Sequence, residues 1–173
     1  MSTTQAAVVY ASMLAVSAIA SVTDFRSGLI PNWLTLPALL LAVCLGATFG
    51  GANGAGLSVL GILVAGGLPL LFLRFGGMGA GDVKLFAALG GLGGARLGLE
   101  IELFALSCAC LWGVVKLTYQ GQLLASLHTS ARLFANIFLP AKHRRSVAAE
   151  QLTQLRIGSV IFAGTVLAIV RAL

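Results

Sequence analysis

The chain has 173 residues, of which 58% are hydrophobic and only 9% are charged, and its mean hydropathy is +1.00. Soluble domains carry about 25% charged residues, so this composition excludes a water-soluble fold and predicts an all-α polytopic membrane protein. The net charge of +6 does not indicate nucleic-acid binding, because basic residues in a membrane protein set its topology and attract anionic lipid. We therefore expect membrane lipid, and no nucleic acid, among its partners.

Six apolar segments are long enough, or nearly so, to cross a bilayer at about 20 residues per crossing. They cover residues 6–22, 33–49, 57–75, 83–99, 101–119 and 157–170. Asn32 follows a proline and is suited to cap the second helix, and residues 50–56 read as an uncharged loop. Six transmembrane helices are predicted.

Residues 120–156 differ in composition from the rest of the chain. Their apolar residues recur at helical spacing, which predicts an amphipathic helix lying in the membrane interface. The basic cluster 142–145 is then expected to anchor this fifth loop to lipid. We expect residues 1–173 to form a single membrane-embedded domain.

Basic residues favour one orientation of the six helices. Nine lie in or beside the first, third and fifth turns, and two lie on the opposite side: Arg26, Arg74, Lys84, Lys116, Arg132, Lys142, Arg144, Arg145 and Arg156, against Arg96 and Arg171. By the positive-inside rule, the odd-numbered turns face the cytoplasm and the N-terminus lies outside.

The chain contains only two aspartates, Asp24 and Asp82. Asp24 ends the first predicted helix and Asp82 begins the fourth, so the predicted topology places both at the cytoplasmic level of the membrane. The glutamates fall elsewhere, Glu100 and Glu102 at the opposite face and Glu150 in the fifth loop. An ionisable residue at such a depth is a candidate functional residue.

Two neighbouring carboxylates can hydrolyse a peptide bond without a metal. One, ionised, takes a proton from the attacking water, while the other, protonated, hydrogen-bonds the carbonyl oxygen and later protonates the leaving amine. Gly79 and Gly81, just before Asp82, lack side chains and would let an extended substrate approach. The cysteines and histidines form neither C-x-x-C nor H-E-x-x-H, so no metal and no cofactor are expected.

Structural explanations of the same residues stay open. An aspartate at a helix N-terminus often only caps the helix, which would account for Asp82. A salt bridge to Arg26 or Lys84 would account for Asp24. Glycine-rich stretches are also common helix-packing surfaces.

Two motifs carry a resemblance to a known family. Asp24 is followed by Ile30-Pro31-Asn32, and later by Gly79-Ala80-Gly81-Asp82-Val83-Lys84. Together they resemble the signature of the type IV prepilin peptidases, which are aspartic intramembrane proteases of the G-x-G-D class. The resemblance covers the chain from the first predicted helix to the fifth.

The resemblance implies cleavage of the short basic leader of prepilin or pseudopilin proteins at the cytoplasmic face of the bacterial inner membrane. It implies that Asp24 and Asp82 are the catalytic dyad and that Gly79, Gly81 and Lys84 belong to the active-site loop. Whether the chain works alone or as an oligomer stays open.

The chain also departs from the larger members of that family. The cysteine-rich insert associated with N-methylation is absent between the first two predicted helices, so methyltransferase activity is not expected. The chain is similar to the short form found in tight-adherence (Flp-type) pilus systems. Arg156-Ile157-Gly158 stands where short members often have proline-tyrosine-glycine, which leaves the role of the last helix open.

Two other functions are weighed against this one. A presenilin-like protease would pair G-x-G-D with tyrosine-aspartate, but Thr23 precedes Asp24. A small proton-coupled transporter would use Asp24 and Asp82 as a relay, and it predicts internal repeats and carboxylates near the bilayer midplane. The sequence shows no repeat, and the predicted topology places no carboxylate at that depth.

Overall fold

The computed structural model describes residues 2–74, 78–119 and 157–173, and the regular structure within these ranges is α-helical. The helices are α1 (Thr3–Ser27), α2 (Asn32–Arg74), α3 (Ala80–Tyr119) and α5 (Gly158–Ala172). Residues Thr3–Ser27, Asn32–Arg74 and Ala80–Val115 are long and apolar enough to cross a membrane, and α5 is apolar but shorter. The predicted all-α membrane fold is confirmed, whereas the amphipathic helix predicted within 120–156 lies outside the described residues.

Helix α1 extends further than the predicted segment 6–22. It runs to Ser27 and ends at Gly28, whose left-handed backbone (φ 67°) is the usual glycine helix terminator. The Gly28 N–H donates to the Asp24 carbonyl oxygen at 2.8 Å. Asp24 therefore lies inside the last turn of α1, not in a turn after it.

Element α2 consists of two helical segments that meet at Gly51, where the sequence predicted two helices joined by a loop. The two segments fold back on each other, because the Ser58 hydroxyl donates to the Ala42 carbonyl oxygen at 3.1 Å. Gly51 interrupts α2 with φ 61° and ψ −148°, values open only to glycine. The predicted loop 50–56 is thus a single-residue break, beside which Gly46 and Gly54 are in backbone contact.

Element α3 likewise consists of two helical segments, where the sequence predicted the helices 83–99 and 101–119. Its break is at Gly94, with φ 85° and ψ 165°, and not at the charged residues near 100. The residues before it, Ala80–Gly93, make a segment of about 21 Å, shorter than the roughly 30 Å bilayer core. The count of six membrane crossings stays a prediction.

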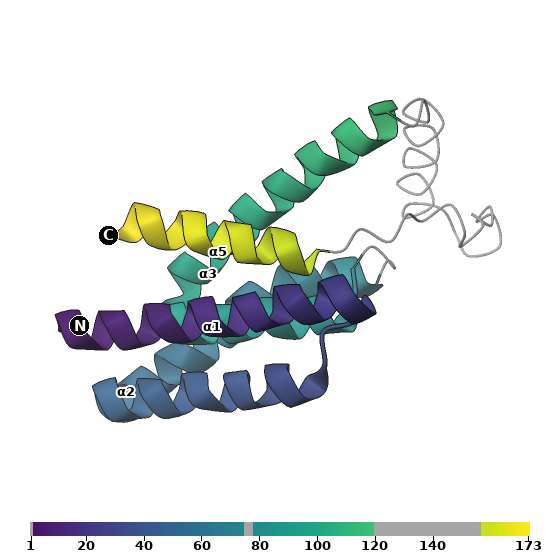
Figure 1. Ribbon diagram of the computed structural model, residues 1–173. Helices are drawn as coiled ribbons and strands as arrows, with labels where there is room; N and C mark the ends of the chain where they lie inside the picture. The colour runs from purple at the N-terminus through teal and green to yellow at the C-terminus, as the bar shows by residue number, and fades with distance from the viewer. Residues whose placement is uncertain (1, 75–77, 120–156) are drawn as a thin grey trace. The chain divides into compact units, whose positions relative to one another are not determined.

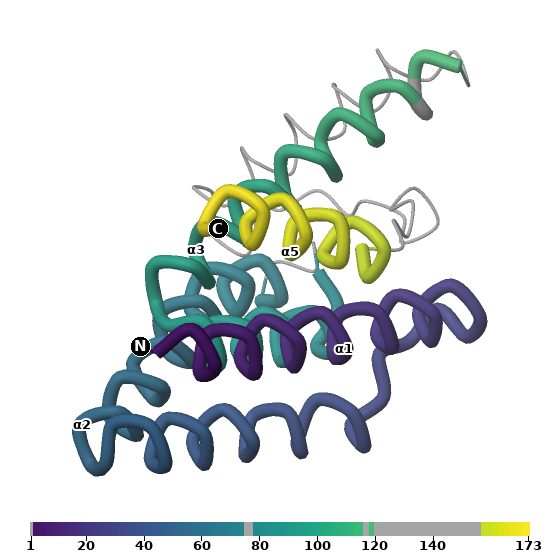
Figure 2. The backbone as a smooth tube through the Cα atoms, turned by 60° about the vertical axis from the view of Figure 1, so that its left-hand side comes forward, coloured from purple at the N-terminus to yellow at the C-terminus, as the bar shows by residue number. Residues whose placement is uncertain are grey.

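The chain divides into two compact units, 1–108 with 156–173, and 109–155. The first unit contains α1, α2, α5 and the first part of α3, and α5 packs along α1 within it (Figures 1 and 2). Fully buried apolar side chains of this unit come from all four helices, among them Met13, Ala65, Phe86, Leu89 and Ile161. That α5 belongs to the same unit means that both ends of the chain contribute to one core.

Glycines allow the close approach of α2 and α3. A Cβ added at Gly90 would lie 2.6 Å from the Gly61 carbonyl oxygen, and one added at Gly91 would lie 3.0 Å from the Ala42 Cβ. No hydrophobic driving force acts between membrane helices, and small residues at their crossings let them come into close contact.

The two sequence motifs lie at one end of this unit. The last turn of α1 and the first turns of α2, α3 and α5 meet there, while the N- and C-termini lie at the opposite end (Figure 1). The motifs around Asp24, Asn32 and Asp82 are therefore neighbours in space.

Candidate active site

Asp24 is buried, with 5% of its surface exposed. Its Oδ2 accepts a hydrogen bond of 2.9 Å from the backbone N–H of Gly158, in the first turn of α5. The Thr23 and Ser27 hydroxyls beside it bond to α1 carbonyl oxygens. The buried carboxylate of Asp24 is therefore held by a backbone N–H that comes from the C-terminal helix.

Asp82 is half-buried in the first turn of α3. Its Oδ2 accepts a hydrogen bond of 3.2 Å from the backbone N–H of Gly79. Gly79 precedes the helix, so this bond is one half of a capping box, in which an acid at the third helical position reaches back to the cap residue. This bond agrees with the structural explanation in which Asp82 caps the helix.

The structure brings the two aspartates together. Asp24 lies in the last turn of α1 and Asp82 in the first turn of α3, and both turns are at the same end of the unit, although 58 positions separate the two residues in the sequence. Among the described residues, the ion pairs are those of Glu100 with Arg96 and Arg171, so a salt bridge from Asp24 to Arg26 or Lys84 is not formed.

The two sequence motifs also contact each other. A Cβ added at Gly81 would lie 2.9 Å from both the Cβ and the carbonyl oxygen of Ile30, so Gly81 leaves space for Ile30 and not for a substrate. Ile30 itself is buried, whereas Gly79 is exposed. Of the two glycines, Gly79 is the one beside which a substrate backbone has room.

Lys84 joins the starts of two helices. Its Nζ donates a hydrogen bond of 2.8 Å to Oδ1 of Asn32. Asn32 is thus the first residue of α2 and a partner of Lys84, whereas the sequence predicted it as a helix cap. The carbonyl oxygen of Pro31 accepts from the amides of Leu34 and Thr35 instead.

Two residues of interest were missed or misplaced by the sequence analysis. Gly158 touches Asp24, but a backbone donor has no side-chain signature. Glu102 was predicted at the opposite membrane face, yet only 2% of it is exposed, and neither carboxylate oxygen has a hydrogen-bond partner among the described residues. Its neighbours Ile101 and Ala105 face Gly164, six residues or about 9 Å along α5 from Gly158.

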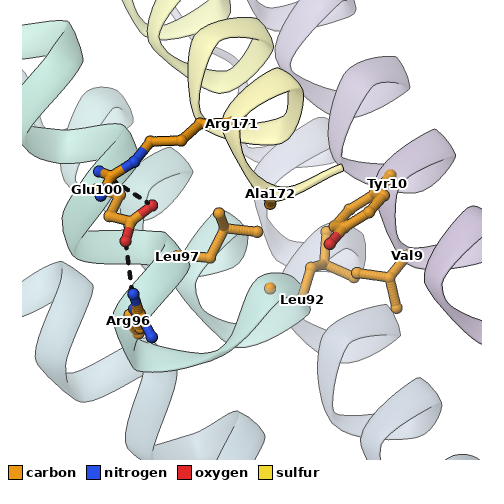
Figure 3. A pocket seen from close by; sticks show the side chains of 9 residues that line it. Val9, Tyr10, Leu92, Arg96, Leu97, Glu100, Arg171 and Ala172 are labelled. Carbon is orange, nitrogen blue, oxygen red and sulfur yellow. Dashed lines mark hydrogen bonds and ion pairs between the residues drawn. The ribbon is translucent and has the colours of Figure 1, made fainter. Parts of the chain in front are cut away.

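A cavity of about 390 Å³ opens elsewhere, between α1, α3 and α5. Val9 and Tyr10 line it, so it lies about 21 Å along α1 from Asp24. Figure 3 shows Glu100 in this cavity between Arg96 and Arg171, at 3.3 Å and 3.9 Å. Its carboxylate is already paired with arginines, so this cavity offers no free acid for catalysis.

Metal chemistry has no candidate centre in the described ranges. No three side chains among histidine, cysteine, aspartate and glutamate gather there in a way that could hold a metal ion.

Comparison with known proteins gives one match. The model of the type IV leader peptidase family matches residues 11–116, more than half of the chain. This segment contains both aspartates and ends before α5. No curated protein and no solved structure matches the chain.

Proposed function

Because the chain belongs to the type IV leader peptidase family, we propose that it is an aspartic endopeptidase whose catalytic dyad is Asp24 and Asp82. The observation that supports the proposal is that the last turn of α1, with Asp24, and the first turn of α3, with Asp82, lie at the same end of the helix bundle. Asp24 is buried and Asp82 is half-buried, and neither has a cationic partner among the described residues.

The dyad hydrolyses a peptide bond with one proton shared between its two carboxyl groups. The ionised carboxylate removes a proton from water as the water oxygen bonds to the carbonyl carbon. The protonated carboxyl donates a hydrogen bond to the carbonyl oxygen, which takes up the developing negative charge. The C–N bond then breaks, the amine leaves with a proton from the dyad, and the pair returns to its starting state.

The surrounding motif residues hold this arrangement. Gly79 donates its N–H to Asp82 and leaves the approach to that side chain open. Gly81 lets α3 pack against Ile30, and Lys84 ties α3 to Asn32 at the start of α2. These residues are positioning residues, since none of them supplies an acid or a base.

The substrate in this proposal is the short basic leader of a type IV prepilin-like protein of the Flp type. The site faces the cytoplasm of the bacterial inner membrane, with the N-terminus outside, as the distribution of basic residues favours. Cleavage occurs at the membrane face, where the leader precedes a hydrophobic helix. N-methylation of the product is not part of the proposal.

Buried Glu102 favours the transporter alternative more than the sequence did. That alternative requires a carboxylate inside the bundle, and Glu102 meets this requirement. Family membership and the convergence of Asp24 with Asp82 favour peptide hydrolysis. Transport is therefore the second hypothesis, to be tested if no cleavage is observed.

The test is cleavage of a co-purified Flp-type prepilin by wild type, Asp24→Asn and Asp82→Asn. Asparagine keeps the size of the side chain and removes its acid–base capacity, so each variant should lose about 10²–10⁴-fold in rate at equal abundance in the membrane. Glu100→Gln is the matched control, because it makes the same chemical change at the opposite end of the unit. Cleavage by either aspartate variant at near wild-type rate would refute the dyad.

A further inference from the structure

The C-terminal helix α5 reaches the candidate active site, although it lies outside the segment matched by the family. Its contact with the site is the buried hydrogen bond of 2.9 Å from the Gly158 N–H to Asp24 Oδ2. We infer that Gly158 is a positioning residue for the dyad and that α5 completes the active site. This inference rests on the proposed function of Asp24.

Only glycine allows this approach of α5 to α1. A Cβ at position 158 would lie 2.7 Å from the Asp24 Cβ and 2.9 Å from its Oδ2. Contacts that short are not tolerated, so either the carboxylate or the helix would have to move. The carboxyl group of Asp24 occupies the space that a side chain at position 158 would need.

The N-terminus of α5 also compensates an unfavourable position of Asp24. A carboxylate in the last turn of α1 faces the negative end of that helix dipole, and burial without a partner would add a desolvation cost. Gly158 is the first residue of α5, where backbone N–H groups are unsatisfied within the helix and the dipole is positive. The hydrogen bond from Gly158 to Asp24 therefore pairs the backbone N–H at the start of α5 and also pairs the buried carboxylate.

The hydrogen bond also fixes which oxygen is available for catalysis. The Gly158 N–H donates a hydrogen bond to Oδ2 of Asp24, and the Gly79 N–H donates one to Oδ2 of Asp82. Within the described ranges no backbone N–H donates to Oδ1 of either carboxyl group, so we assign Oδ1 to share the proton and to contact water. Each member of the dyad is thus oriented by one backbone N–H at the start of a helix.

Contacts along α5 pack this helix against α1 and α3. Near Asp24, the Ser21 hydroxyl donates to the Ser159 hydroxyl at 3.2 Å. Further along, Gly164 packs against Ile101 and Ala105 of α3. At the other end, Arg171 pairs with Glu100 at 3.9 Å, so α5 is held over its whole length.

The first experiment compares Gly158→Ala with Gly164→Ala on the purified enzyme, with kcat, KM and thermal midpoint measured for each. Misplacement of a catalytic group by about 1 Å costs on the order of 10²-fold, so Gly158→Ala should lower kcat about 10–100-fold with KM within about twofold. Gly164→Ala places a Cβ 2.9 Å from the Ala105 nitrogen, far from Asp24. It should lower the thermal midpoint and leave kcat per folded molecule unchanged.

A second variant removes the donor without adding any atom that could disturb folding. Glycolic acid at position 158 replaces the amide by an ester and deletes the N–H. The matched control is the equivalent ester at Val160, whose N–H makes an ordinary bond of 2.9 Å to the Ile157 carbonyl. The ester at 158 should lower kcat at least about tenfold more than the ester at 160.

Equal kcat values for the two esters, or an unchanged kcat in Gly158→Ala, would overturn the role of Gly158 and leave the dyad intact. Failure of the proposed function is recognised separately, because Asp24→Asn would then cleave the prepilin as wild type does.

Discussion

At the scale of single residues, the two aspartates are held by backbone amides and not by cations. Gly158 and Gly79 each donate one N–H. A lysine or arginine beside a carboxylate favours its ionised form, whereas a dyad needs one of its two carboxyl groups protonated at any time. Backbone donors fix the orientation of both groups without adding a full positive charge between them.

The hydrogen bond from Lys84 to Asn32 makes a testable contribution to this orientation. It ties the first turn of α3, which carries Asp82, to the start of α2 at 2.8 Å. Lys84→Met and Asn32→Ala should each reduce cleavage several-fold, and the double variant should lose no more than the worse single variant. Such non-additivity is the signature of two residues that act through one interaction.

The measurement is kcat/KM for the prepilin in all four forms of the enzyme. Arg96→Met serves as the control, because it removes a cation from α3 at the opposite end of the unit. Additive losses in the double variant would show that Lys84 and Asn32 act independently.

Glu102 is expected to matter for stability and not for cleavage. Both of its carboxylate oxygens lack partners among the described residues, and a buried polar group without hydrogen bonds costs about 1–3 kcal/mol or more. Glu102→Met, of similar size, should therefore raise the thermal midpoint, and Glu102→Gln should keep cleavage within about twofold. A folded but inactive Glu102→Gln protein would contradict this expectation and assign Glu102 a task in proton transfer.

At the scale of helices, the apolar runs predict which segments are helical but not where the helices break. Residues 50–56 contain four glycines, and only Gly51 leaves the helical conformation. Similarly, the break in α3 falls at Gly94 and not at Glu100. Glycine both terminates helices and packs them closely, and tertiary contacts decide between these roles.

Glycines that pack helices can be distinguished from those that do not by matched substitutions. Gly90 lies against Gly61 and Ala65, whereas a Cβ at Gly67 would meet nothing within 4 Å. Gly90→Ala should destabilise the enzyme by about 1–3 kcal/mol through overpacking. Gly67→Ala should be neutral or stabilise it by up to about 1 kcal/mol, since alanine is the better helix former.

Thermal midpoints in detergent, together with the fraction of each variant recovered from the membrane, would check this pair. The expectation is wrong if Gly90→Ala is as stable as Gly67→Ala, because α2 and α3 would then not be in backbone contact at this position.

At the scale of the whole molecule, the sequence predicted the convergence of Asp24 and Asp82 but not the contribution of α5. The convergence of the aspartates follows from counting helices and membrane crossings, since the predicted topology places both at the same membrane level. The partner of Asp24 is a backbone amide 134 residues away, and no residue type marks such a donor. The packing of α5 along α1, and not a motif, brings it there.

The arrangement of the helices makes a last prediction about topology. The two termini lie at the end of the unit opposite to the last turn of α1, which contains Asp24 (Figure 1), as expected if an even number of crossings separates them. Arg96 and Arg171 line the cavity at that end, whereas the other nine basic residues lie in or beside the odd-numbered predicted turns, so the positive-inside rule favours the end with the termini as the outer one. Both termini should therefore lie outside, with Arg26 and Lys84 on the cytoplasmic side.

Fusions of alkaline phosphatase and of green fluorescent protein to each terminus would measure this orientation, because the first is active only outside the cytoplasm and the second fluoresces only inside it. Active phosphatase at both ends is the expected result. A fusion after Ser27, at the end of α1, should give the opposite pattern. Fluorescence at the two termini would place the dyad outside, where a leader that has not crossed the membrane could not reach it, and the proposed cytoplasmic cleavage would then be untenable.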